Sequence, residues 1–122
     1  MSKKIQMYLT MILLMVLLVG FGCSGAEGDR KLVNDLMESN GIELKEIQGE
    51  SEKKLQFQSY VINKKRQIIA LNLDSTQTKD IVLLKDLTSL KVLDLTAIEG
   101  RDFTPLKSLV NLEKLLLGGN IF

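Results

Sequence analysis

The sequence contains no histidine and no tryptophan, and it has a single cysteine and a single proline. Without histidine, the chain lacks the side chain that most often serves as a general base near neutral pH and as a metal ligand. One cysteine excludes an internal disulfide framework. The sequence also has no glycine-rich motif of the kind that binds nucleotides. We therefore expect no enzyme: no catalytic residues, no cofactor and no metal site.

The sequence also lacks a large net charge of either sign. The chain has 16 basic and 15 acidic residues, and two of the basic ones, Lys3 and Lys4, lie at the N-terminus. The rest of the chain is therefore nearly neutral, which gives no electrostatic reason to expect a nucleic-acid partner. Neighbouring carboxylates such as Glu50 and Glu52 lie in a polar stretch, where solvated charge is their ordinary role.

The N-terminus has the parts of an export signal. Lys3 and Lys4 precede an apolar run over residues 8–19, and glycines follow just before Cys23. A positive start, a short apolar stretch and small residues before a cleavage site are typical of a secretory signal peptide, here residues 1–22. The alternative is an uncleaved membrane helix over residues 5–22, which is slightly short of the roughly 20 apolar residues that span a bilayer.

The segment VGFGC around Cys23 resembles a bacterial lipobox. In that family a small residue precedes a cysteine that is lipidated and becomes the mature N-terminus. Gly22 matches the position before the cut, whereas Gly20 and Phe21 depart from the usual leucine and small residue. The resemblance implies a lipid anchor on Cys23 that holds the chain on the extracytoplasmic face of the cell membrane. An incidental thiol, with plain secretion, is the alternative. Residues 23–28 then form the lipidated cysteine and a flexible tether.

Residues 29–67 are expected to form a helix and a β-hairpin. Apolar residues at helical spacing predict a helix over residues 29–41, with Asp29 as its cap and Gly41 as its stop. Residues 42–52 are mixed in character and indicate a loop. Apolar and polar residues then alternate from Leu55 to Ile62, before a polar turn and a second apolar strand that begins at Gln67. Helix and hairpin together are expected to cover the N-terminal end of the remaining chain, residues 68–122.

The strongest internal signal is a repeat of 22 residues. Three apolar positions recur twice at this offset: Ile68, Leu71 and Leu73, then Leu90, Leu93 and Leu95, then Leu112, Leu115 and Leu117. Three intervening positions keep the same step: Ile81, Leu84 and Leu87 correspond to Phe103, Leu106 and Leu109. A heptad helix is the alternative, but the spacing and Pro105 in the middle of a unit argue against it.

This pattern resembles the leucine-rich repeat LxxLxLxxN, and the segment over residues 102–112 resembles the 22-residue internalin-like type in particular. The resemblance implies an α/β repeat solenoid: a short leucine-rich-repeat array over residues 68–122 with parallel strands on its concave face and an incomplete third unit. The repeat asparagine is present only as Asn120, and its equivalents are Thr76 and Ile98. Such arrays normally need about three repeats and a terminal cap. A truncated or non-functional remnant of a longer surface protein is therefore the alternative.

If leucines fill the core, the residues between them must point outward on the concave sheet. Besides Ala70 and Gly118, this predicts a mixed polar and apolar surface made of Asn72, Asp74, Val92, Asp94, Thr96, Lys114 and Leu116. Such a surface suits a protein or peptide ligand, whose identity the sequence does not give. Lys107, in contrast, is expected on the convex side.

Overall fold

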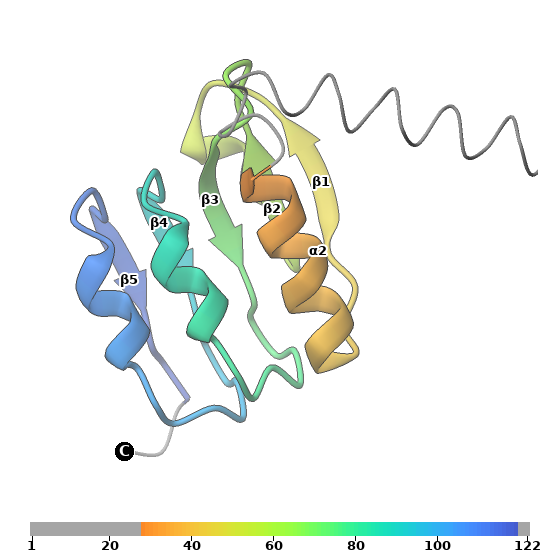
Figure 1. Ribbon diagram of the computed structural model, residues 1–122, viewed down its shortest axis with the longest axis vertical. Coiled ribbons are helices and arrows are strands. Elements are labelled where there is room, and N and C mark those ends of the chain that lie inside the picture. Colours follow the sequence, from red (N-terminus) through yellow and green to blue (C-terminus); the bar gives the residue numbers. More distant parts are fainter. Residues whose placement is uncertain (1–27, 120–122) are drawn as a thin grey trace, which may run out of the picture.

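The computed structural model describes residues 28–119 of the chain (Figure 1). The predicted signal peptide over residues 1–22, Cys23 and Asn120 lie outside the described residues. Within them no helix is both long and apolar enough to span a bilayer. The elements in chain order are α2 (Gly28–Asn40), β1 (Lys45–Gln48), η1 (Glu52–Lys54), β2 (Ser59–Ile62), β3 (Ile68–Asn72), η2 (Val82–Asp86), β4 (Val92–Asp94), η3 (Thr104–Ser108) and β5 (Lys114–Leu116), where η denotes a 3-10 helix.

The five strands form one sheet in the order of the sequence, β1-β2-β3-β4-β5. β2 and β3 are antiparallel, whereas the other three neighbouring pairs are parallel. Leu71 pairs with Leu93 and Leu93 with Leu115, so the register of β3, β4 and β5 confirms the 22-residue equivalence of these leucines. The sheet as a whole is small and mixed. The interpretation of its parallel half as a leucine-rich-repeat solenoid stays a prediction.

The main core lies on one face of the sheet, which α2, η2 and η3 cover side by side (Figure 1). It consists largely of the apolar residues that define the repeat. Its fully buried members include Ile68, Leu71, Leu73, Leu84, Leu87, Leu90, Leu93 and Leu95, and α2 adds Val33 and Leu36. A smaller apolar cluster of Val61, Ile69 and Ala70 lies apart from it, with Leu55, Ile47 and Val92 packed against it.

Helix α2 spans nearly the residues expected from the sequence. Gly41 follows its last residue with φ of 65°, the left-handed conformation that ends helices at glycine. The predicted cap is wrong, because Asp29 lies inside the first turn and its Oδ2 accepts a hydrogen bond from the Ile68 amide at 2.9 Å. Gly28 also belongs to the helix and not to the tether. At the other end, Asn40 Oδ1 accepts from the Lys79 amide at 2.9 Å, which fixes the helix to the segment before η2.

The hairpin of β2 and β3 turns over residues 63–66, where Arg66 adopts a positive φ of 60°. Two features of this region differ from the expectation. The segment expected to be a loop contains β1, which pairs in parallel with β2 although Ile47 is its only large apolar residue. The first hairpin strand is also shorter than predicted. The residues between Leu55 and β2 contain a tight turn at Gln58, whose φ is 49°.

Candidate functional site

A groove of about 420 Å³ lies on the face formed by β3, β4 and β5, and 3-10 helix η1 borders it. Five of the seven residues predicted for the concave face line it: Asn72, Val92, Asp94, Lys114 and Leu116. Four further residues, which the sequence did not nominate, complete the lining: Glu52, Lys53, Leu55 and Glu113. The structure therefore brings most of the predicted surface together.

The wall formed by η1 is held in place by hydrogen bonds within the segment from η1 to β2 and by one bond to the turn after β3. Ser51 caps η1, because its side chain accepts from the Lys53 amide at 3.2 Å. After η1, the Ser59 hydroxyl donates to the Gln56 carbonyl at 2.7 Å and accepts from the Gln56 amide at 2.9 Å. The side chain of Gln58 reaches the Asp74 carbonyl at 3.1 Å. These bonds fix the segment that contains Leu55 over the first strand of the repeat.

In one column of residues on this face, exposure increases from β3 to β5. The three residues at equivalent positions of these strands are Ala70, Val92 and Lys114. Ala70 is fully buried in the cluster that Leu55 joins, Val92 is half-buried, and Lys114 is exposed. Ala70 therefore lies on the predicted face, away from the leucine core, but the expectation that it is exposed there is wrong. In this column the open part begins at β4, because Leu55 packs against the cluster that contains Ala70.

Asn72 and Asp94 occupy equivalent positions at the ends of β3 and β4 and make the same local bond. The Oδ1 atom of each accepts from the backbone amide two residues further on, Asp74 and Thr96 respectively, at 2.9 Å in both cases. Such Asx turns direct the chain out of a strand. Leu116 is the third member of this column and has no side-chain acceptor to repeat the bond.

Asp94 is only 8% exposed, contrary to the expectation of an open, solvent-facing carboxylate. Its local bond explains why an acidic side chain is tolerated there, since a buried polar group needs a partner. The two remaining predicted residues, Asp74 and Thr96, do not line the groove. Asp74 and Thr96 belong to the turns that follow β3 and β4. The side chain of Asp74 accepts from the Ser75 hydroxyl at 2.8 Å within its turn.

The groove combines three apolar side chains with three carboxylates, two lysines and an amide, the last of which is Asn72. Apolar side chains of a ligand would contact Val92, Leu55 and Leu116, while charges of both signs stand around them. Six of the nine lining residues are polar or charged, so a ligand held there would make polar contacts alongside the apolar ones. Among residues 28–119, no group of three or more acidic or cysteine side chains is placed to hold a metal ion.

Sequence reasoning missed Glu52, Lys53, Leu55 and Glu113 for different reasons. Glu113 directly precedes Lys114 and was available from the repeat register alone. Leu55 and its neighbours come from a segment outside the repeat, and only the folded chain places them at the groove. Comparison with known proteins adds no further guide, because no family model, no curated protein and no solved structure matches the chain.

Proposed function

We propose that the chain is a membrane-anchored surface lipoprotein whose short leucine-rich-repeat module binds a protein or peptide segment in the groove over β3, β4 and β5. The anchor is the lipid on Cys23, after cleavage of residues 1–22, and the module lies on the extracytoplasmic face of the membrane. The role is recognition and not catalysis.

The repeat interpretation rests on three strands that follow one another at a constant offset. β3, β4 and β5 are parallel and in register at 22-residue spacing, and η2 and η3 form the returns between them. The backbone repeats too: Ser75, Ala97 and Gly119 all have φ between 53° and 74° at the same offset. A single sequence motif that returns with one backbone conformation favours stacked, equivalent coils.

The observation that carries the proposed function is the groove itself. Its lining comes from three successive strands and from η1, so a ligand segment lying across the strands would contact all of them. Lys114 and Glu113 are exposed at its open end, where Leu116 adds apolar surface. Recognition surfaces of this kind use a few apolar contacts for affinity and charges for orientation.

A display selection tests this assignment. Short random peptides would be selected on the immobilised full chain in neutral detergent, and each captured peptide would be measured against two charge reversals. Lys114→Glu alters the groove, while Lys107→Glu alters an exposed residue of η3 outside it. We expect weaker binding, by about tenfold, for Lys114→Glu only, as loss of a charge contact at an interface produces. Equal affinities of both variants and the unchanged protein would contradict the groove assignment.

The anchor is tested independently of the groove. Metabolic labelling with a fatty-acid analogue should mark the protein, and Cys23→Ser should abolish the label. Detection of the initiator methionine on the membrane-bound protein would indicate an uncleaved helix in place of the lipid.

A further inference from the structure

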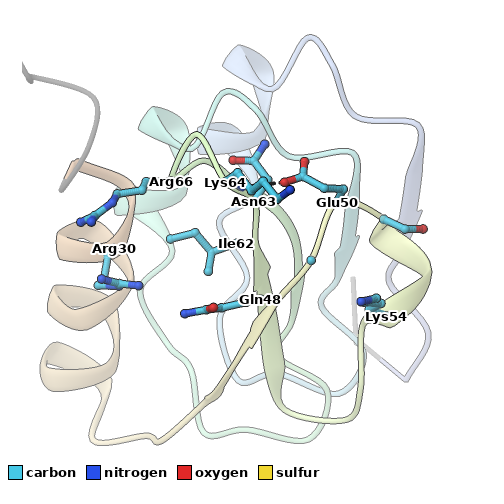
Figure 2. Close-up of a pocket in the computed structure, with 10 residues that line it drawn as sticks. Arg30, Gln48, Glu50, Lys54, Ile62, Asn63, Lys64 and Arg66 are labelled. Carbon is cyan, nitrogen blue, oxygen red and sulfur yellow. Dashed lines mark hydrogen bonds between the residues drawn. The ribbon is translucent and has the colours of Figure 1, made fainter.

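A second pocket, of about 680 Å³, lies at the other end of the molecule from β5 (Figure 2). Three segments form it: the first turn of α2, the stretch from β1 to η1, and the end of β2 with its turn into β3. Its charged lining is one-sided, with four cationic side chains against the single carboxylate of Glu50: Arg30, Lys54, Lys64 and Arg66. Such a concentration of one sign is unexpected in a chain that is otherwise nearly neutral.

We propose that this pocket binds a phosphate group, as a monoester or diester. Arg30 and Arg66 lie on the same side of Ile62 and provide the two guanidinium groups, while Lys54 lies on the other side (Figure 2). Guanidinium groups match the oxygens of phosphate with paired hydrogen bonds, and ammonium groups add positive charge around them. The pocket is larger than a phosphate alone requires, which leaves room for the organic group attached to it.

The cations of the pocket are largely unneutralised. Of the four, only Arg30 takes part in an ion pair among the described residues, through its Nε atom to Glu46 Oε1 at 2.9 Å. The same carboxylate oxygen accepts a hydrogen bond from the Tyr60 hydroxyl at 2.9 Å. Tyr60 therefore positions the Glu46 carboxylate, which in turn holds the Arg30 side chain at Nε. The Nε atom is thus bonded to Glu46, so an anion would approach the terminal nitrogens of the guanidinium.

Hydrogen bonds within the protein fix the backbone around the pocket without a ligand. Glu50 Oε1 accepts from the Lys64 amide at 2.8 Å, and the Gly49 amide donates to the Ile62 carbonyl at 3.0 Å. Both bonds join the segment after β1 to the hairpin. The Arg66 amide donates to the Asn63 carbonyl at 2.9 Å, which holds Arg66 in its left-handed conformation. The single carboxylate of the lining is therefore engaged with the backbone, and the turn fixes the backbone from which the exposed Arg66 side chain extends.

The test compares two neighbouring residues of one turn. Arg66→Asn removes a cation of the pocket with a residue that tolerates the left-handed conformation. Lys65→Asn removes the same charge from the same turn but outside the pocket lining. The full chain in neutral detergent would be titrated with inorganic phosphate and with glycerol phosphate at constant ionic strength, while NMR follows the side-chain N–H signals of Arg30 and Arg66.

We expect saturable shifts of these signals in the unchanged protein and in Lys65→Asn. Affinity should fall by about tenfold or more in Arg66→Asn, since a charge-assisted hydrogen bond is worth at least that factor. Lys54→Gln, away from the turn, should also weaken binding and guards against a folding defect in the turn variant. Absence of saturation, equal losses in Arg66→Asn and Lys65→Asn, or equal affinity for acetate would each overturn the proposal.

The source of the phosphate is decided in lipid nanodiscs. With phosphatidylglycerol present and no added phosphate, shifted Arg30 and Arg66 signals would identify the lipid headgroup as the ligand. Signals that move only after glycerol phosphate is added would identify a free phosphate ester. Both outcomes support the phosphate site, and neither depends on whether the groove over β3, β4 and β5 binds a peptide.

Discussion

Strands β4 and β5 place equivalent leucines of the 22-residue repeat in different environments. Leu93 in β4 is fully buried between Leu71 and Leu115, its partners in the sheet, whereas Leu115 in β5 is 38% exposed. Leu116 is exposed to the same degree, and Val110 is more exposed still. In contrast, the opposite end of the sheet is covered by α2 and bordered by β1. A leucine at this repeat position is therefore not buried by its own strand alone, because burial requires packed neighbours on each side.

The two ends also differ in their polar contacts. At the covered end, Glu46 joins α2 to the sheet through Arg30 and Tyr60, and Asp29 joins it through the Ile68 amide. At the exposed end, β5 bonds to its neighbour through backbone pairs such as Leu95 amide to Leu116 carbonyl, at 2.8 Å. Two side chains before β5 also donate to the preceding unit, Ser108 to the Lys85 carbonyl at 2.6 Å and Asn111 to the Thr88 carbonyl at 2.8 Å. Both ends therefore have side-chain bonds, but those at the covered end involve carboxylates, which join a helix to the sheet.

The largest expected difference is between the two equivalent leucines. Leu93→Ala should lower the free energy of unfolding by about 2–5 kcal/mol, as truncation of a fully buried leucine does. Leu115→Ala should cost about 1 kcal/mol, because the side chain has already kept part of its surface in water. Urea unfolding followed by circular dichroism measures both. Similar costs would mean that β5 is covered as completely as β4.

Alkaline pH should affect the covered end selectively. Burial, together with the hydrogen bond to Glu46, raises the pKa of Tyr60 to about 12, from an ordinary value of 10.0. The folded state keeps the phenolic proton longer than the unfolded state, so this stabilisation is complete below pH 10 and is lost as pH rises towards 12. The difference between a pKa of 10.0 and one of about 12 corresponds to about 2–3 kcal/mol in the free energy of unfolding. Tyr60→Phe should flatten the decline in stability over this range, and an unchanged slope would contradict the assigned environment.

A third comparison concerns two glycines. A Cβ atom at Gly100 would lie 2.5 Å from the Lys79 carbonyl oxygen, whereas one at Gly118 would meet only Thr96 Cγ2 at 3.9 Å. Gly100→Ala should therefore cost about 1–3 kcal/mol, because backbone must move to admit the methyl group. Gly118→Ala in the last coil should be nearly neutral. Thermal unfolding of the two variants, side by side, checks this difference, and the reverse order would show that the coils are spaced differently.

The smallest expected effect is at Asp94, where two variants distinguish the contribution of its hydrogen bond from that of its charge. Asp94→Ala removes the acceptor for the Thr96 amide and should cost about 1 kcal/mol. Asp94→Asn keeps an oxygen at that position, as Asn72 does in β3, and should have almost no effect. Leu116→Asn, at the equivalent exposed position, should stay within about 0.5 kcal/mol of the unchanged protein. Equal losses for the Ala and Asn variants of Asp94 would assign the effect to its charge.

The features that the sequence predicts well are those encoded by local periodicity. The 22-residue offset predicts the pairing of Leu71, Leu93 and Leu115, because identical units place equivalent residues side by side. Helical spacing and Gly41 predict α2 to within a residue at each end. Five residues of the groove are predicted from the same register.

The features that it misses depend on long-range contacts. β1 has a weak strand pattern and exists because β2 offers it a partner, with Glu46 opposite Tyr60. The wall at η1 and the burial of Asp94 likewise require segments that are distant in sequence. Arg30 and Arg66 of the cationic pocket come from separate elements, so no sequence motif predicts the pocket.

The most direct test of the proposed function is to map where a selected peptide binds. Backbone amide signals of the full chain would be followed by NMR as a peptide captured in the display selection is added. We predict shifts concentrated at Asn72, Val92, Asp94 and Lys114 and at the bordering residues of η1. Shifts concentrated at Lys85 and Lys107 would place the ligand on the opposite, helical face and contradict binding in the groove.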